Sequence, residues 1–358
     1  MTETLIPPAG STEPHGAERA AGDVLLEVED LAVEFRSDDG AVRAVDGLSY
    51  RVEAGRTLAL VGESGCGKSV SSLAVMGLLP PTARVVRGTA RYRGTDLLAL
   101  SPTEHRRHCG THVAMVFQDA LAALNPVHTV GYQLTESLRA RTGTSRREAR
   151  RRAVELLDLV KVPNAAQRVD EYPHQFSGGM RQRVMIASAL ALDPDVLIAD
   201  EPTTALDVTV QAQVLRLLAE IQAERQMGLV LITHDLGVVA GVADDVTVMY
   251  AGRAVEHAPV RDLYAKPAHP YTRALLRSVP RLDAVDTRAA GDHAGGRLPV
   301  VPGRPPAPGH APSGCSFHPR CDMARDLCRT DEPALDDVAP GRSSACHFAA
   351  ELLGGARA

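Results

Sequence analysis

The chain has 358 residues, of which 44% are hydrophobic and 23% are charged, a composition typical of a folded protein with room for one large domain and a smaller one. A formal net charge of −5, only 3% aromatic residues and no tryptophan argue against a nucleic-acid-binding protein, which is usually basic and offers rings for base stacking. No apolar run is long enough to span a membrane.

The N-terminal part of the chain predicts a tail followed by strands. Residues 1–23 lack both a basic start and a continuous apolar stretch, so we interpret them as a disordered tail and not as a signal peptide. A chain without such a signal is expected to stay in the cytoplasm. Residues 24–35, VLLEVEDLAVEF, alternate apolar and polar side chains as a strand does. Residues 56–62, RTLALVG, are typical of a buried strand that leads into a helix.

Further along, buried strands alternate with helical segments. DVLIAD (195–200) and GLVLITHD (228–235) are short apolar runs, and Asp207 can cap the helix that begins after it. This alternation predicts an α/β fold with a mainly parallel sheet, into which a helical block at about 120–180 is inserted.

The character of the sequence changes after about residue 260. Residues 297–314 are rich in proline and glycine and predict an extended loop, and a cysteine-bearing tail follows it. We therefore expect a domain over 24–260 and a C-terminal extension over 261–358.

The motif GESGCGKS, at 62–69, lies between a predicted strand and a predicted helix and fits the phosphate-binding pattern G-x-x-x-x-G-K-[S/T]. Its glycines let several backbone N–H groups face the β-phosphate of a nucleotide. Lys68 can reach the β- and γ-phosphate oxygens, and the Ser69 hydroxyl can bind Mg²⁺. The motif predicts an ATP site that contains Gly62, Glu63, Ser64, Gly65, Cys66, Gly67, Lys68 and Ser69.

Three more side chains follow buried strands and are expected near this loop. Asp200 ends the VLIAD strand, where it can hold the magnesium ion through water. Glu201 comes next and can orient and deprotonate an attacking water molecule. His234, at the end of another strand, can contact the γ-phosphate. We predict Lys68, Glu201 and His234 as the catalytic residues.

Five motifs occur in order along the chain: GESGCGKS, FQD (117–119), FSGGMRQR (176–183), LIADEPTTALD (197–207) and THD (233–235). Together they resemble the ATP-binding subunit of an ABC transporter, and the resemblance covers about 24–260. It implies a P-loop ATPase fold with a mainly parallel sheet core, an antiparallel β subdomain and a helical insertion.

The resemblance assigns further residues to the nucleotide. Gln118 is expected to sense the γ-phosphate and magnesium, so that Ser69, Gln118 and Asp200 are the predicted Mg²⁺ site. Gln118 is also expected to line the surface that touches the membrane partner, and Phe35 to stack on adenine.

The FSGG segment opens an apolar helix, and a helix N-terminus is a ready site for an anion. In the family two ATPase domains pack head to tail, so this element covers an ATP held by the partner. The family's usual LSGGQ is here FSGGM, which keeps the serine and both glycines. The expected contacts in trans are Ser177, Gly178, Gly179, Met180 and Asp207.

The stretch KPAHPYTRALLRSVP (266–280) and the tail CSFHPRCDMARDLC resemble the oligopeptide/dipeptide/nickel importer branch. The resemblance implies an ATP-hydrolysing subunit for peptide import, bound peripherally to the cytoplasmic face of the membrane. Its partners are a second, homologous ATPase subunit (a heterodimer), two permeases and, indirectly, an extracytoplasmic peptide-binding protein, with no nucleic acid. A nickel importer is the alternative within the branch. A soluble ABC ATPase is disfavoured because the interval from Gln118 to Ser177 is too short for a long coiled coil.

Four cysteines lie close together near the C-terminus, with the spacing C-x5-C-x6-C-x17-C. Disulfides are not expected in the cytoplasm, and the tight C-x2-4-C pair of most zinc sites is missing. A [4Fe–4S] cluster tolerates wider ligand spacing, and the resemblance favours it because some ATPases of this branch carry one. Zn²⁺ and four unliganded thiols remain the alternatives. The predicted ligands are Cys315, Cys321, Cys328 and Cys346.

Overall fold

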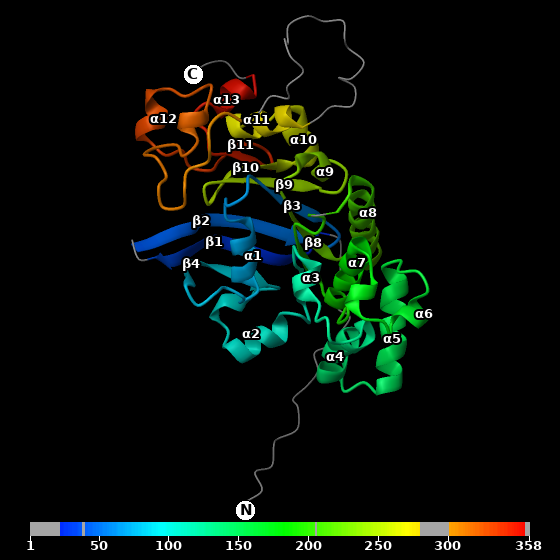
Figure 1. The fold of residues 1–358 in the computed structure, drawn as a ribbon. Coiled ribbons are helices and arrows are strands. Elements are labelled where there is room, and N and C mark those ends of the chain that lie inside the picture. Colours follow the sequence, from blue (N-terminus) through cyan, green and yellow to red (C-terminus); the bar gives the residue numbers. More distant parts are fainter. Residues whose placement is uncertain (1–21, 38–39, 205, 280–300, 355–358) are drawn as a thin grey trace, which may run out of the picture.

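The computed structural model of the chain describes residues 22–37, 40–204, 206–279 and 301–354 (Figure 1). Within these residues the strands form an eight-stranded sheet of order β11-β12-β10-β9-β3-β8-β7-β6 and a four-stranded sheet of order β2-β1-β4-β5. The strands are Val24–Ser37 (β1), Gly40–Glu53 (β2), Thr57–Val61 (β3), Ala83–Tyr92 (β4), Thr95–Asp96 (β5), Val113–Val116 (β6), Val196–Asp200 (β7), Gly228–Thr233 (β8), Asp245–Tyr250 (β9), Arg253–Pro259 (β10), Asp336–Ala339 (β11) and Arg342–Ser344 (β12).

Helices connect the strands of the larger sheet and cover it (Figure 1). The helices are Lys68–Val75 (α1), Pro102–His108 (α2), Ala120–Ala123 (α3), Val130–Thr142 (α4), Arg146–Leu159 (α5), Ala165–Arg168 (α6), Gly178–Ala189 (α7), Val208–Arg225 (α8), Leu236–Val239 (α9), Val260–Ala265 (α10), Pro270–Ser278 (α11), Asp326–Thr330 (α12) and Ala349–Leu352 (α13). The chain also forms short 3-10 turns at Leu97–Ala99, Pro173–Gln175 and His318–Arg320.

The middle of the larger sheet is parallel. The carboxyl ends of its strands therefore lie along one edge, where several of the predicted site residues follow them. β9, β3, β8, β7 and β6 run parallel to one another. The inner strands β3, β6, β7 and β8 are buried along their whole length, which is why each has a continuous apolar sequence. Val61 pairs with Thr233 and Asp200 with Ile232, so three strands end side by side. The predicted α/β fold is confirmed.

The four-stranded sheet is antiparallel and shares a core with the larger one. Leu26 of β1 and Val45 of β2 belong to the same cluster as Leu60 of β3. Helix α1, which follows the predicted phosphate loop, contributes Val75 to this cluster. The loop is therefore followed by a helix that is held between two sheets.

A block of helices, α3 to α6, lies between β6 and β7 in the sequence, where a helical insertion was expected at about 120–180. These helices and α7 form a second apolar core, which includes Leu134, Leu156 and Ile186. In Figure 1 helices α4, α5 and α6 of this block lie at the lower right, and α3 lies nearer the centre. Helix α7 packs against α8 as well as against the block, so it connects the block to the sheet domain.

The C-terminal part of the chain returns to the larger sheet. β12 pairs with β10 through Glu256 and Ser344, and β11 pairs with β12. Tyr250, Tyr271 and Phe317 pack together in a third apolar cluster. Residues 301–314 contain neither helix nor strand, as expected for an extended loop. The other part of that loop, 297–300, lies outside the described residues, and so do residues 1–21 of the tail expected at 1–23.

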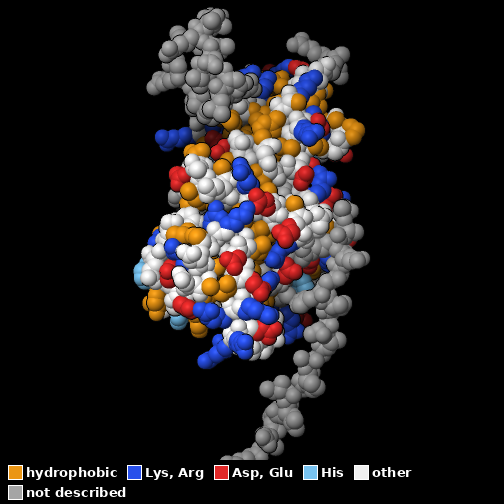
Figure 2. All heavy atoms as spheres, turned by 90° about the vertical axis from the view of Figure 1, so that its right-hand side faces the viewer, with side chains coloured by type: hydrophobic (Ala, Val, Ile, Leu, Met, Phe, Trp, Pro, Cys, Tyr) orange, Lys and Arg blue, Asp and Glu red, His pale blue; other side chains and the backbone are white. Residues whose placement is uncertain are grey.

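No helix in the described ranges combines the length and the apolar character needed to cross a membrane. On the face shown in Figure 2, acidic and basic side chains are interspersed.

Candidate functional site

The predicted phosphate loop has the strand-loop-helix geometry that its sequence indicates. β3 ends at Val61, and α1 begins at Lys68. Gly65 and Gly67 have φ values of 83° and 101°, a left-handed backbone that other residues rarely adopt. A Cβ atom at Gly67 would also lie 2.5 Å from the Ala44 carbonyl oxygen. Side chains at these positions would therefore disturb the loop.

Lys68 and Ser69 begin α1 and point to different partners. The Lys68 ammonium group is buried and donates to the carbonyl oxygens of Gly62, at 2.7 Å, and Glu63, at 3.2 Å. The Ser69 hydroxyl donates to the Asp200 carboxylate at 2.9 Å. Burial raises the pKa of the Asp200 carboxyl, and the bond from Ser69 opposes this rise. A hydroxyl and a carboxylate in contact are ligands that Mg²⁺ accepts.

The Glu201 carboxylate contacts three side chains from separate segments of the chain. The Gln118 amide donates to Glu201 Oε2 at 3.0 Å, and the Thr204 hydroxyl donates to the same oxygen at 3.0 Å. His234 Nδ1 lies 3.3 Å from Glu201 Oε1. Glu201 itself has a φ of 44°, a strained conformation for a residue with a side chain. The structure thus brings Gln118, Glu201 and His234 together.

Thr204 is the member of this group that sequence reasoning missed. The signal for it lay in the motif LIADEPTTALD, because residues three apart in a tight turn can contact each other. Its hydroxyl bond restricts the Glu201 carboxylate to one orientation.

The Ser177 element lies on a different part of the surface from the phosphate loop. The Ser177 side chain caps α7 by accepting from the Met180 N–H at 3.4 Å, and Ser177 and Gly178 are exposed. Within the described residues, no hydrogen bond or ion pair joins Ser177–Met180 to residues 62–69. Asp207 caps α8 through a bond from the Val210 N–H at 3.0 Å, as predicted.

Phe35 lies on β1, in the four-stranded sheet, where it is half-buried and pairs with Val42 and Ala83. Its expected contact with adenine remains a prediction.

The four C-terminal cysteines line one small cavity, together with the rings of Phe317 and Phe348. Burial raises the pKa of the Cys321 thiol to about 11 and that of Cys346 to about 12, so both favour the protonated form. In the described part of the chain, no group of three or more His, Cys, Asp or Glu side chains is arranged to hold a metal ion. The expected iron–sulfur cluster is therefore not confirmed.

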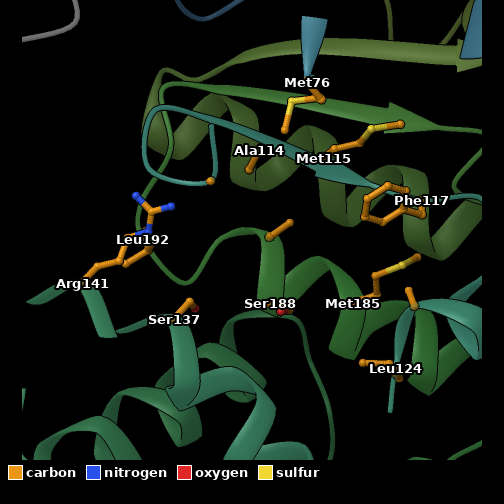
Figure 3. A pocket seen from close by; sticks show the side chains of 13 residues that line it. Met76, Ala114, Met115, Phe117, Leu124, Ser137, Arg141, Met185, Ser188 and Leu192 are labelled. Atoms are coloured by element: carbon orange, nitrogen blue, oxygen red, sulfur yellow. The ribbon is translucent and has the colours of Figure 1, made fainter. Parts of the chain in front are cut away.

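A hollow of about 310 Å³ lies beside the loop that carries Gln118 (Figure 3). Its lining comes mainly from β6, α3, α4 and α7, and Phe117, the neighbour of Gln118, forms part of it. Leu121 on α3 is 63% exposed next to this lining. The lining residues labelled in Figure 3 are Met76, Ala114, Met115, Phe117, Leu124, Ser137, Arg141, Met185, Ser188 and Leu192.

Comparisons with known proteins agree with this geometry. The family described as ABC transporter matches residues 45–204, and the family described as oligopeptide/dipeptide transporter, C-terminal region, matches residues 255–328. The dipeptide transport ATP-binding protein DppD of Escherichia coli is 48% identical over 324 residues, which are 90% of this chain and 96% of that protein. The oligopeptide transport ATP-binding protein OppD of Mycobacterium bovis is 52% identical over 90% of this chain and 51% of that protein.

Among solved structures, the dimeric structure of MJ0796, a bacterial ABC transporter cassette, aligns with a TM-score of 0.60 and 25% identity. The alignment covers 66% of this chain and 99% of the cassette.

The fold and the site therefore define an ATP-hydrolysing cassette of an ABC transporter. The chain belongs to the family of oligopeptide and dipeptide transport ATP-binding subunits.

Proposed function

We propose that this chain hydrolyses ATP to drive import of dipeptides or oligopeptides, from the cytoplasmic face of the membrane. The observation that carries the proposal is the convergence of Gln118, Thr204 and His234 on Glu201 at the end of β7. The Glu201 carboxylate, whose orientation these contacts restrict, therefore follows directly after Asp200, which is hydrogen-bonded to Ser69. The match of residues 255–328 to the peptide transporter C-terminal region supports the substrate class.

The phosphate loop binds the nucleotide in this proposal. Backbone N–H groups of residues 62–69 surround the phosphates, and the Lys68 ammonium neutralises the β- and γ-phosphate charge. Ser69, Asp200 and Gln118 would hold Mg²⁺, which offsets further phosphate charge when bound. Phe35 would stack on the adenine.

Glu201 acts on the attacking water. Its carboxylate accepts a proton while the oxygen of the water forms a bond to the γ-phosphorus and the bond to the leaving ADP oxygen breaks. The bonds from Gln118 and Thr204 fix the carboxylate, and His234 lies 3.3 Å from its other oxygen. His234 would contact the γ-phosphate from the end of the neighbouring strand. The domain over 24–260 carries all of these groups.

A second ATPase subunit completes each nucleotide site. Ser177 and Gly178 are exposed at the N-terminus of the 12-residue helix α7, and within the described residues no hydrogen bond joins Ser177–Met180 to the chain's own phosphate loop. This element therefore suits the γ-phosphate of a partner's ATP, with Asp207 near the same interface. MJ0796, a related cassette, is dimeric in its solved structure.

The hollow in Figure 3 receives a membrane permease. Its lining is mostly apolar, and Leu121 and Val127, which flank the lining residues Ala123 and Leu124 in the sequence, are exposed. Phe117 lines the hollow and Gln118 contacts Glu201, so a segment bound there would act on the catalytic carboxylate through two adjacent residues.

Leu121→Asp is expected to weaken assembly with the permeases about ten-fold, because it puts a charge into an apolar contact. ATP binding by the free chain should not change. The control is Val86→Asp, a substitution at a 38% exposed position on β4, which belongs to the four-stranded sheet and does not line the hollow. Co-purification with tagged permeases measures both variants, and equal recovery of Leu121→Asp and the unsubstituted chain would contradict the docking site.

A nickel importer remains the second candidate within the branch, and uptake of labelled peptide against Ni²⁺ by the assembled transporter distinguishes the two. The chain would not act on nucleic acid. A chain that shows full ATPase activity alone, without permeases or an extracytoplasmic binding protein, would instead indicate a non-transport ATPase.

A [4Fe–4S] cluster is proposed at the C-terminal cysteines, because all four line one cavity. Binding would require the four thiols to draw together, since no group of three is arranged to hold a metal ion in the described residues. When bound, the cluster would cross-link the C-terminal region. The ligands would be Cys315, Cys321, Cys328 and Cys346.

Protein purified without oxygen is expected to be brown, with broad absorption near roughly 400 nm and about four irons per chain. Cys328→Ser should lose most of the iron, whereas Cys109→Ser, at a buried cysteine away from this cavity, should retain it. Colourless protein with one zinc per chain would favour Zn²⁺, and metal-free protein with a folded C-terminal region would exclude both metals.

A further inference from the structure

The Arg320 guanidinium connects the C-terminal region to the phosphate loop. Its side chain is only 4% exposed. Nη1 donates to Glu63 Oε2 at 2.6 Å and Nη2 to Glu63 Oε1 at 3.0 Å, across 257 residues of sequence. Nε donates to the Pro302 carbonyl oxygen at 2.7 Å, and this bond fixes the plane of the guanidinium group. Such two-bonded arginine–carboxylate pairs are among the strongest polar contacts in proteins.

Glu63 is the second residue of the phosphate loop, and it is held at three points. Arg320 binds its carboxylate, and the Tyr271 hydroxyl oxygen accepts from its backbone N–H at 3.0 Å. Its carbonyl oxygen accepts from the Lys68 ammonium at 3.2 Å. Two of these three contacts therefore come from residues beyond 260, outside the region that carries the catalytic groups.

The same arginine is packed against rings that reach the cysteine cavity. Its guanidinium carbon lies 5.7 Å from the centre of the Tyr250 ring and 5.9 Å from that of Phe317. Phe317 also contacts Tyr271 and lines the cavity of the four cysteines. A continuous set of contacts thus runs from the phosphate loop through Arg320 and Phe317 to that cavity.

We propose that Arg320 is a positioning residue of the nucleotide site, which holds Glu63 so that ATP affinity depends on the folded C-terminal region. The inference rests on the proposed role of residues 62–69 in binding ATP. Coupling of this kind is reciprocal, so ATP must stabilise the C-terminal region by the same factor.

ATP affinity of the full chain is the first measurement. Arg320→Gln and Glu63→Gln should each raise the Kd for ATP about ten-fold, because each leaves a charged group without its partner. The double variant Glu63→Gln with Arg320→Gln should be no weaker than either single variant. In the assembled transporter KM for ATP should rise while kcat at saturating ATP stays within about two-fold. Arg320→Lys, which keeps the charge, should recover part of the affinity.

The matched control is Arg325→Gln. Arg325 also forms a two-bonded pair in the C-terminal region, with Glu351 at 2.9 and 2.7 Å, but its partner lies outside the phosphate loop. A Kd that Arg320→Gln leaves unchanged, or that Arg325→Gln raises equally, would overturn the inference.

Hydrogen exchange gives a second readout that does not depend on turnover. ATP should slow exchange of the amides of residues 313–330 in the unsubstituted chain and in Arg325→Gln, but not in Arg320→Gln. Lys68→Ala distinguishes a failure of the proposed nucleotide site from a failure of the proposed role of Arg320. If Lys68→Ala binds ATP normally, the proposed nucleotide site fails and this inference with it. If Lys68→Ala loses ATP but Arg320→Gln does not, only the role of Arg320 fails.

Discussion

Replacing Glu201 with glutamine is expected to lower ATP hydrolysis by the assembled transporter about 10²–10⁴-fold, because a positioned base is lost. The amide has nearly the same shape as the carboxylate and can still accept the bonds that Gln118 and Thr204 donate. It cannot take the proton of the attacking water. ATP binding should therefore be preserved, and single-turnover hydrolysis together with an equilibrium nucleotide-binding assay measures the two effects separately.

Two further variants serve as comparisons for Glu201→Gln, one in the phosphate loop and one on the surface. Lys68→Ala removes a buried cation from the phosphate loop and should weaken ATP binding instead of the chemical step. Glu224→Gln changes an exposed carboxylate on α8 and should alter neither. Normal turnover by Glu201→Gln in the assembled complex would show that another group activates the water.

The strands of the parallel core were predictable because their burial leaves a direct trace in the sequence. β3, β7 and β8 are covered on both faces, so each is a short apolar run bounded by turn residues or acids. β11 and β12 leave no such trace, since they have four and three residues and β11 is largely exposed. Their place in the larger sheet depends on the pairing of β12 with β10, a tertiary contact that local pattern does not encode, and on the pairing of β11 with β12.

In the candidate site, too, some residues were predictable from the sequence and others were not. The phosphate loop, Asp200 and Ser177 each serve a local structure, a tight turn, a strand end or a helix cap, and local structure has a sequence signature. The bonds of Glu63 to Arg320 and Tyr271 join residues more than two hundred positions apart. Nothing in the sequence around HPRC distinguishes Arg320 from an exposed arginine, so only the folded structure shows its partner.

The second large effect is expected at Gly178. Gly178→Asp should weaken ATP-dependent pairing with the second ATPase subunit about 10²–10³-fold, because a carboxylate placed against a partner's γ-phosphate is a like-charge contact. The substitution should not disturb the chain itself. The nearest atom to a Cβ at Gly178 is Leu206 Cδ2 at 3.8 Å, an ordinary contact, and the backbone there is helical. At Gly179, by contrast, a Cβ would lie 2.5 Å from Val210 Cγ1.

Pairing is best measured by size-exclusion chromatography with the partner subunit and ATP, using Glu201→Gln in this chain and the equivalent substitution in the partner subunit so that the ATP is not consumed. Gly241→Asp is the matched control, because a Cβ at this exposed glycine meets nothing within 4 Å and the same charge is added outside the Ser177–Met180 element, in the segment after α9. The Gly178→Asp chain should still bind ATP at its own phosphate loop, since Ser177–Met180 is not bonded to residues 62–69. If that variant loses its own nucleotide but pairs normally, the element acts within its own chain and not across the interface.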